Sequence, residues 1–367
     1  MPGSRRARIP RGKRLAAILA AQLALLVLVA LAGETFVRCW REGSVRRGFA
    51  SYLDSGSAPV DPGTKGFFLH DPELGYRLNP SQPGFNSLSF RGTEVAGKTP
   101  GRTRLLVVGD SVAWDKDGFV AMLAREVEAR APGRLEVLNA AIPGYTTHQE
   151  RIFLDRLVGP VRPDLVVLEY CLNDNHRFLH RLTEDGGWLL TGEARAALMP
   201  DGDGALAWLA RRSYLAFEIR KRRLARARDH GELRPWESEP DFGPAWKPET
   251  WPAEREEFAA IHRTCRAAGA QLLVLAAPYE PQLAADRLEK ERAVVLDPQA
   301  RLAAICEEEG LPFLDLEPAF EAHARVPGSA ALFHDKVHPT PAGHAIAERA
   351  LRERLVALGW IPPEAAQ

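Results

Sequence analysis

Five short apolar runs alternate with amphipathic segments between residues 105 and 359, and this alternation limits the possible folds more than any other feature of the sequence. Apolar runs of this length predict strands buried on both faces of a sheet. Strands that alternate with helices predict a mostly parallel sheet covered by helices on both sides. The expected strands are 104–109, 135–141, 163–171, 271–278 and 311–316, and the expected helices are 117–133, 146–158, 253–270, 297–310 and 340–359.

Several helix ends carry the residues that favour capping. Thr340 followed by Pro341 predicts the start of the last helix, because threonine accepts hydrogen bonds from free N–H groups and proline suits the first helical position. Asp297 is expected to cap the helix before it, and Thr146 or Thr147 to cap the second helix.

The N-terminus predicts a membrane segment. Residues 1–14 are rich in arginine and lysine and lack acids, and residues 15–32 contain only one polar residue, Gln22. A helix of this apolar length rises about 27 Å, close to the thickness of a bilayer core. We interpret 1–14 as a cytoplasmic tail and 15–32 as an uncleaved signal anchor, which places residues 33 onward outside the cytoplasm. A cleaved signal peptide remains the alternative, since Ala-Leu-Ala at 30–32 would suit cleavage.

Three further segments lie outside the alternating pattern. Residues 33–60 follow the anchor as a juxtamembrane segment, and residues 61–104 are expected to form an ordered lead-in rather than a domain. Residues 176–250 are expected to form an insertion over one end of the sheet. Within it, 213–228 predicts a basic helix that either is a solvated face or contacts lipid headgroups or an anionic ligand.

Charge and cysteine content narrow the classes of partner. The formal net charge is zero, so nothing global indicates nucleic-acid binding. No Cys-x-x-Cys pair occurs, which argues against a zinc or redox site, and buried free thiols are the default interpretation. The four cysteines are Cys39, Cys171, Cys265 and Cys306.

Ser111 is the candidate nucleophile. It follows the first expected strand in Gly-Asp-Ser, and ligands of parallel α/β sheets bind beyond the carboxyl ends of the strands. The helix that begins there offers free N–H groups to a developing negative charge. Asp110 is expected to hold the turn. Taken alone, the tripeptide predicts only a polar turn, so Ser111 needs a base elsewhere.

His338 is the preferred base, because it lies between the last strand and the last helix. Asp335 precedes it by three residues, a spacing that lets the carboxylate reach Nδ1 and leave Nε2 for the serine. His334 is a rival on the far side of Asp335. His344 falls within the last helix and is expected to face solvent or to pack, and His148 is expected to have a surface or supporting role.

Donors for an oxyanion hole follow the second and third strands. Gly144 allows a backbone N–H to approach a ligand closely, and Asn173 can turn its side-chain amide toward the site. With the N–H of Ser111 they would form a three-donor oxyanion hole.

These blocks together resemble the SGNH (GDSL-type) hydrolase family. Gly-Asp-Ser at 109–111 is similar to the first block, Gly144 in Ala-Ile-Pro-Gly-Tyr-Thr-Thr to the second, Leu-Asn-Asp at 172–174 to the third, and Asp-Lys-Val-His from Asp335 to the fifth. Cys171 stands where the third block usually has glycine. The resemblance covers roughly 100–360, and Phe-Asn-Ser-Leu-Ser-Phe-Arg-Gly at 85–92 is similar to the lead-in of membrane-anchored members.

The resemblance implies a three-layer α/β/α fold with a flavodoxin-like sheet, a serine-ester intermediate and no metal or cofactor. It assigns Ser111, His338 and Asp335 to a catalytic triad, with Asp110 and Asp174 in support. The expected function is an exported, membrane-anchored esterase acting on a small-molecule or polysaccharide ester.

Two alternatives stay open at this stage. One is an O-acetyltransferase for envelope or secreted polysaccharide, and the other is a catalytically idle binding module. The acetyltransferase draws on a possible sugar-stacking surface made of Trp208, Trp236, Trp246 and Trp251.

Overall fold

The computed structural model places most of the chain. It describes residues 11–41, 45–50, 57–58, 66–182, 188–190, 213–231, 233–239 and 241–366. The cytoplasmic-tail prediction for 1–14 lies mostly outside these residues, as does Trp208.

A five-stranded sheet forms the centre of the molecule, and every neighbouring pair of its strands is parallel. Its spatial order β10-β9-β6-β4-β5 corresponds to 5-4-3-1-2 in chain order, which is the flavodoxin-like arrangement. The predicted sheet is therefore confirmed. The strands are β4 (Thr103–Val108), β5 (Leu135–Asn139), β6 (Leu165–Tyr170), β9 (Gln271–Ala276) and β10 (Phe313–Asp315).

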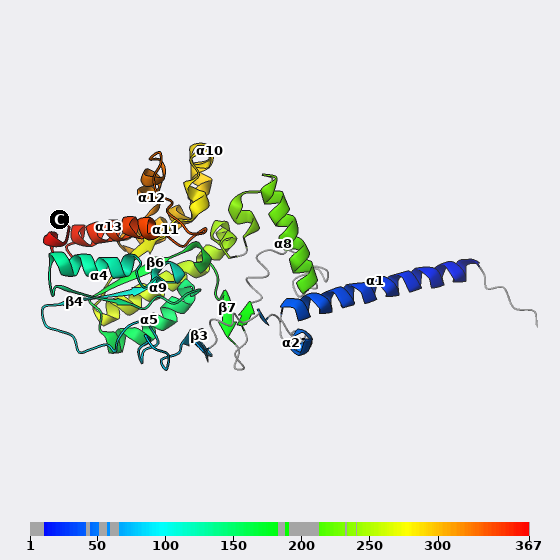
Figure 1. The fold of residues 1–367 in the computed structure, drawn as a ribbon, viewed down its shortest axis with the longest axis horizontal. Coiled ribbons are helices and arrows are strands. Elements are labelled where there is room, and N and C mark those ends of the chain that lie inside the picture. Colours follow the sequence, from blue (N-terminus) through cyan, green and yellow to red (C-terminus); the bar gives the residue numbers. More distant parts are fainter. Residues whose placement is uncertain are drawn as a thin grey trace, which may run out of the picture.

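Helices cover both faces of this sheet, so the molecule has the three expected layers (Figure 1). Leu105 and Val107 pack on one side of β4, and Leu106 and Val108 pack on the other, because successive side chains point to opposite faces. One face carries α4 (Phe119–Arg130), α12 (Glu317–Ala324) and α13 (Pro341–Ala357); the other carries α5 (Thr147–Val161), α9 (Trp251–Ala268) and α11 (Asp297–Glu309).

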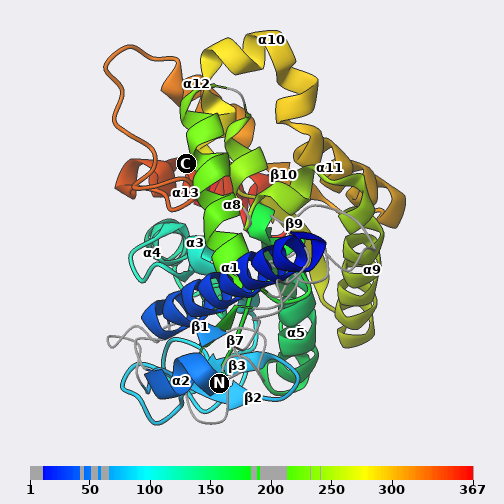
Figure 2. The ribbon, with the colours of Figure 1, turned by 90° about the vertical axis from the view of Figure 1, so that its right-hand side faces the viewer.

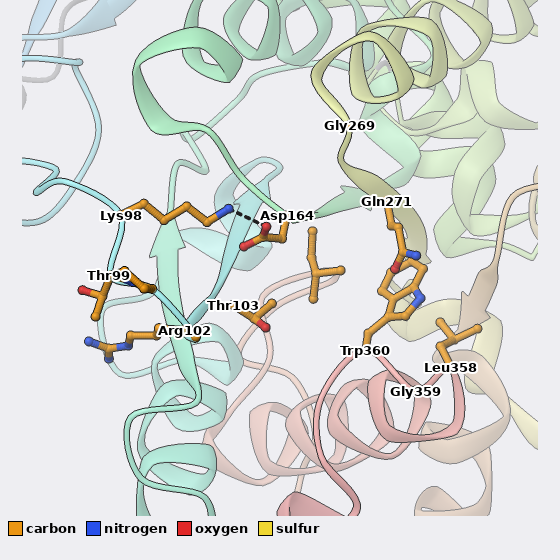
Figure 3. A pocket seen from close by; sticks show the side chains of 13 residues that line it. Lys98, Thr99, Arg102, Thr103, Asp164, Gly269, Gln271, Leu358, Gly359 and Trp360 are labelled. Carbon is orange, nitrogen blue, oxygen red and sulfur yellow. Dashed lines mark hydrogen bonds and ion pairs between the residues drawn. The ribbon is translucent and has the colours of Figure 1, made fainter.

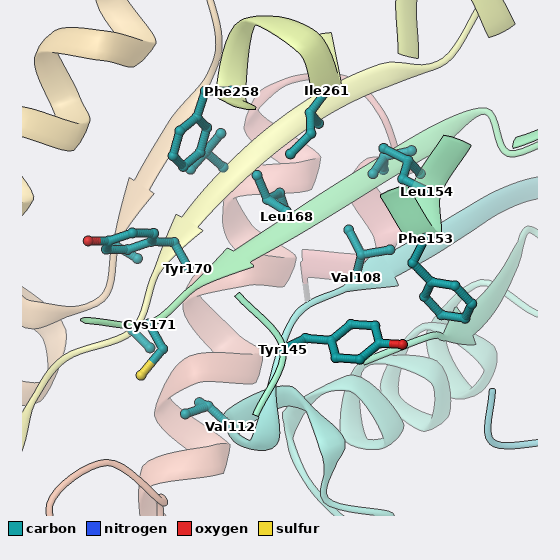
Figure 4. Close-up of a cluster of buried hydrophobic side chains, with 14 of the residues drawn as sticks. Val108, Val112, Tyr145, Phe153, Leu154, Leu168, Tyr170, Cys171, Phe258 and Ile261 are labelled. Atoms are coloured by element: carbon teal, nitrogen blue, oxygen red, sulfur yellow. The ribbon is translucent and has the colours of Figure 1, made fainter. Parts of the chain in front are cut away.

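The core beneath α5 and α9 extends to the strand ends where the site lies. Figure 4 shows Phe153 from α5 and Phe258 from α9 on the side of the sheet that Val108 and Leu168 face. Cys171, directly after β6, is buried in the same cluster. The cysteine that departs from the family pattern therefore packs in the core, just beyond the strand.

Most helix ends follow the capping pattern in the sequence. Thr340 accepts a hydrogen bond from the N–H of Gly343, and Thr146 forms a capping box with Gln149. Asp297 is a correction: α11 begins at Asp297 itself and its N-cap is Leu296. The Asp297 carboxylate instead accepts a hydrogen bond from Arg301 one turn later, at 2.7 Å.

The structure adds elements that the hydrophobic pattern did not predict. The lead-in contains a hairpin of β2 (Phe68–Asp71) and β3 (Gly75–Leu78), whose turn is held by N–H groups that donate to Asp71. Helices α10 (Ala285–Val295) and α12 lie between the expected elements of the second half. A small sheet joins β1 (Ser57–Ala58), β8 (Trp188–Leu190) and β7 (His180–Leu182). Short 3₁₀ helices lie at Leu172–Asp174, Pro235–Ser238, Gly243–Trp246, Pro248–Thr250, Glu280–Leu283 and Pro363–Ala366.

The apolar N-terminal segment is one helix, α1 (Arg11–Arg41), that projects from the domain (Figure 1). Within it, Ala17–Trp40 is long and apolar enough to cross a membrane. The helix continues beyond the expected span end at Ala32, because Glu34 and Arg38 pair within it at 2.7 Å and the helix then packs against α8 (Tyr214–Asp229). A short helix, α2 (Val45–Ala50), follows.

Candidate active site

Ser111 opens the short helix α3 (Ser111–Trp114), directly beyond the carboxyl end of β4. The Asp110 carboxylate accepts a hydrogen bond from the N–H of Val112 at 2.8 Å and so caps this helix. Gly109 has no room for a side chain, since a Cβ there would lie 2.6 Å from Oε2 of Glu169. The turn at Ser111 is thus held by the Asp110 cap on one side and by the buried Glu169 carboxyl on the other.

The loop before α13 brings His338 to this serine. Nε2 of His338 lies 2.9 Å from Oγ of Ser111, and its Nδ1 lies 2.6 Å from Oδ2 of Asp335. The other oxygen of Asp335 accepts the N–H groups of Val337 and His338, both at 2.9 Å. Burial alone would raise the pKa of the Asp335 carboxyl, but the hydrogen bonds from His338 and Val337 outweigh it and hold the pKa below its usual value. The carboxylate therefore stays ionised beside the imidazole as the pH falls.

These groups open into a cleft of about 420 Å³ lined by Ser111, His338, Trp114 and Pro143. Arg91, from the lead-in, lies over the ring of Trp114 at 3.9 Å and lines the same cleft. A second depression, about 810 Å³, lies at the opposite edge of the sheet, where the strands begin (Figure 3). Its lysine, Lys98, is paired with Asp164, and its described lining holds no histidine, cysteine or serine. The cleft beside Ser111 is the better candidate.

The two expected oxyanion donors lie around the same strand ends. Gly144 has a φ of 75°, and a Cβ there would meet the hydroxyl of Tyr76 at 3.0 Å, so both conformation and space favour glycine. Asn173 lies in the 3₁₀ helix after β6, where it is buried and hydrogen-bonds the Asp110 carboxyl. Asp174 accepts the N–H of Cys171 at 3.1 Å, which closes that turn.

The rival histidines have other partners. His344 is buried, stacks on Phe119 and accepts the Phe119 N–H at 3.2 Å, so it packs rather than facing solvent. His148 is buried as well and binds Glu257 at 2.6 Å, so a surface role for it is wrong. His334 lines the cleft, but His338 is the one that reaches Ser111.

Three of the four tryptophans of the expected sugar-stacking surface are described by the structure, and all three are packed, which corrects that interpretation for them. Trp236 and Trp251 are only 3% and 5% exposed. Trp246 stacks on Trp236 with ring centroids 4.4 Å apart, and its indole N–H donates to the carbonyl of Val294. The surface invoked for an acetyltransferase is therefore mostly interior.

A cluster of buried carboxyl groups lies beneath the site, and its three glutamates, Glu150, Glu169 and Glu254, were not predicted from the sequence. Glu169 lies within β6, where a charged residue in an otherwise apolar strand was the available signal. Its Oε2 accepts the Asp110 N–H at 3.2 Å. Burial, together with the charges of Asp110 and Glu150, raises the pKa of Glu169 well above its usual value. Burial and the charges of Asp110 and Glu254 likewise raise the pKa of Glu150, whose oxygens have no hydrogen-bond partner among the described residues. The members of the cluster are Asp110, Glu150, Glu169, Asp174 and Glu254.

Replacing Glu254 with glutamine is expected to remove part of the pH dependence of stability. Burial raises the pKa of Glu254 from 4.5 to about 8, so the folded state keeps a proton that the unfolded state loses over this range. The contribution of Glu254 to stability is therefore fully present below pH 4.5 and is lost as the pH rises toward about 8, by on the order of 5 kcal/mol. Denaturant unfolding at several pH values measures the slope. Glu256→Gln, an exposed change on the same helix, should keep the wild-type slope, and an unchanged slope in Glu254→Gln would count against a protonated Glu254.

The chain matches a known protein family. The sequence profile of the GDSL-like lipase/acylhydrolase family matches residues 107–346. No curated protein sequence matches the chain significantly.

Solved structures similar to this chain include a catalytic mutant of Axe2, an acetylxylan esterase from Geobacillus stearothermophilus, with 17% identity, 71% of this chain and 96% of that chain covered, and a TM-score of 0.44. LAE5, an alpha/beta hydrolase from the metagenome of Lake Arreo, Spain, has 18% identity, coverage of 70% and 95%, and a TM-score of 0.42. TesA has 19% identity, coverage of 70% and 99%, and a TM-score of 0.41.

Proposed function

Because this chain belongs to the GDSL-like lipase/acylhydrolase family and is a carboxylic ester hydrolase, we propose that it is an exported, membrane-anchored serine esterase. Ser111 is its nucleophile, His338 its general base and Asp335 the acid of its triad. The observation that carries this proposal is the continuous contact from Ser111 Oγ to His338 Nε2 at 2.9 Å and from His338 Nδ1 to Asp335 Oδ2 at 2.6 Å.

The reaction follows from these distances. Ser111 Oγ attacks the ester carbonyl carbon while its proton passes to Nε2 of His338. The C–O bond to the alcohol then breaks, and the same proton goes to the departing alcohol oxygen. Water attacks the acyl-serine with His338 again as base, which releases the carboxylic acid and restores the serine. Asp335 keeps Nδ1 protonated and stabilises the imidazolium that forms in each half-reaction.

The negative charge that develops on the carbonyl oxygen requires donors. We assign the N–H groups of Ser111 and Gly144 and the side-chain amide of Asn173 to this role. The contact between Asn173 and Asp110 supports it, because it holds the asparagine beside the serine turn. An amide has two N–H groups, so one can contact Asp110 while the other serves the oxyanion. Asp110 and Asp174 position the turns that carry these donors.

Membrane anchoring rests on α1. We propose that residues 15–32 cross the membrane, with 1–14 in the cytoplasm and a hydrolase domain at 105–360 outside it. The apolar helix supports the span, and the basic residues before it support the orientation. The large side chains along its apolar stretch are about half exposed or more, as lipid contact requires; they include Leu23, Leu26, Leu28 and Val29.

A serine-reactive fluorophosphonate probe tests the nucleophile. We expect the probe to label the folded protein at one serine, and peptide mapping to place the label on Ser111, because only a serine activated by a base reacts quickly. His338→Ala should greatly slow labelling, whereas His230→Ala, an exposed change at the end of α8, should not. A folded protein that is not labelled would indicate an idle binding module instead.

A further inference from the structure

Helix α8 is the most strongly cationic element of the described chain that the proposed esterase does not use. On one side of α8, Tyr214 and Phe217 are buried. The opposite side exposes Ile219, Arg222, Arg223 and Arg226, which share one stripe at helical spacing. None of these three arginines forms an ion pair with a described residue, although Arg228 nearby pairs with Glu239 at 3.1 Å.

The structure fixes α8 to the end of the apolar helix. The carboxylate of Glu34 in α1 accepts the N–H groups of Tyr214 and Leu215, each at 2.9 Å, and the hydroxyl of Ser213 at 2.7 Å. A negative charge at a helix N-terminus is stabilising, and it satisfies N–H groups that the helix leaves unpaired. Arg38 completes the junction, because its guanidinium lies 4.5 Å from the ring centroid of Tyr214.

This junction sets the direction of α8. In Figure 1, α8 runs roughly across the direction of α1 rather than along it. Figure 2 views the molecule from the side from which α1 projects and shows α8 running over that side. If α1 crosses a bilayer, α8 lies parallel to the membrane plane and next to the headgroups.

Exposed apolar side chains also lie at the end of α1 and in α2, which follows it. Phe36 and Trp40 at the end of α1 are 70% and 62% exposed, and Phe49 in α2 is exposed as well. Tryptophan, like Trp40, is enriched where membrane proteins meet the headgroup layer, because its amphipathic ring suits a boundary between hydrocarbon and water. Ile219 adds an exposed apolar side chain on the arginine stripe itself.

We propose that α8 rests on the membrane surface and that Arg222, Arg223 and Arg226 bind anionic phospholipid headgroups. This rests on the proposed membrane anchor. Arginine donors match phosphate geometry, and a polybasic segment beside a membrane span is attracted to anionic lipid. The contact sets the orientation of the catalytic domain. Because α13 starts beside His338 and ends near the C-terminus, which Figure 1 places at the end of the domain away from α1, the site lies at the end nearer the membrane.

The test uses the full chain in lipid nanodiscs with a fluorophore at position 219. The variant is Ile219→Cys in a Cys39→Ser background, because the other cysteines are buried and so protected from labelling. A quencher attached to lipid headgroups reports contact. We expect about threefold more quenching in discs containing phosphatidylglycerol than in pure phosphatidylcholine discs, with high salt removing the difference. A label at Glu353→Cys, exposed on α13, should show little quenching in either.

Charge variants separate lipid binding from simple proximity. Changing Arg222, Arg223 and Arg226 together to glutamine should abolish the phosphatidylglycerol effect, whereas the matched set Arg125, Arg134 and Arg349, also exposed, should leave it intact. A label that is unquenched in both lipids, or quenched equally in both, would overturn the proposal. A wild-type chain that does not incorporate into discs would instead reject the membrane anchor. A wild-type chain that does not hydrolyse esters would reject the esterase, so the three failures are distinguishable.

Discussion

Replacing Ser111 with alanine is expected to lower kcat/KM for p-nitrophenyl acetate by about 10⁴-fold or more. The variant keeps the helix cap, because the Asp110 carboxylate still accepts the N–H of Val112, and it loses only the oxygen that lies 2.9 Å from His338 Nε2. No acyl-enzyme can then form, and any residual rate comes from binding and the oxyanion donors. Steady-state kinetics on the purified full chain measures the effect.

The matched control is Ser81→Ala, an exposed serine in the lead-in. It should hydrolyse the ester at the wild-type rate within about twofold, since surface substitutions away from special features are close to neutral. The unfolding midpoint of Ser111→Ala should also stay near that of wild type. Equal activity in Ser111→Ala and wild type would mean that another group performs the hydrolysis.

The parts of the site that could be predicted from sequence are those that follow a strand. Ser111 lies directly after β4 and Asn173 shortly after β6, so knowing that the strands are parallel was enough to bring them to one edge. His338 required more, because it lies in the loop between α12 and α13, well after the last strand. Its three-residue spacing from Asp335 made the contact predictable, since a turn of that length is short enough to close on itself.

Contacts between segments that are far apart in the sequence were not predictable in this way. Glu169 and Glu150 come from β6 and α5, and their closeness depends on how the helix packs on the sheet. Arg91 reaches the cleft because its backbone pairs with Phe85, and the ring of Phe85 lies 6.0 Å from that of Trp114. Contacts like these depend on tertiary packing between distant segments, which hydrophobic periodicity does not report.

The fold also has a part that the sequence predicted and a part that it did not. The strong alternation of 105–359 predicted all five strands of the main sheet, whereas the hairpin of β2 and β3 lies in a segment with weak periodicity. That hairpin owes its stability to side chains from far along the chain. Arg156 of α5 forms an ion pair with Asp71 at 2.7 Å, and the hydroxyl of Tyr76 donates to the carbonyl of Pro143. The lead-in thereby braces the loop that carries Gly144.

Replacing Asp335 with asparagine is expected to lower kcat/KM for the same ester by about 10³–10⁴-fold while the loop keeps its shape. In the wild type the N–H groups of Val337 and His338 donate to Oδ1 of Asp335 at 2.9 Å, and the asparagine carbonyl can still accept both. Its amide nitrogen then faces Nδ1 of His338 and donates to it. That interaction favours the tautomer with the proton on Nε2, which cannot accept the proton of Ser111.

Because Asp335 is partly exposed, Asp335→Asn is more informative than Asp335→Ala. The carboxylate is about half exposed, so in Asp335→Ala a water molecule can occupy its place and accept a hydrogen bond from the Nδ1–H group. We therefore expect Asp335→Ala to retain more activity than Asp335→Asn, an order that a merely structural carboxylate would reverse, since asparagine preserves the loop hydrogen bonds. Asp229→Asn, an exposed change at the end of α8, should leave kcat/KM within about twofold of wild type. If Asp335→Asn were equally active, control of the tautomer by Asp335 would be rejected, and the carboxylate would only shape the loop.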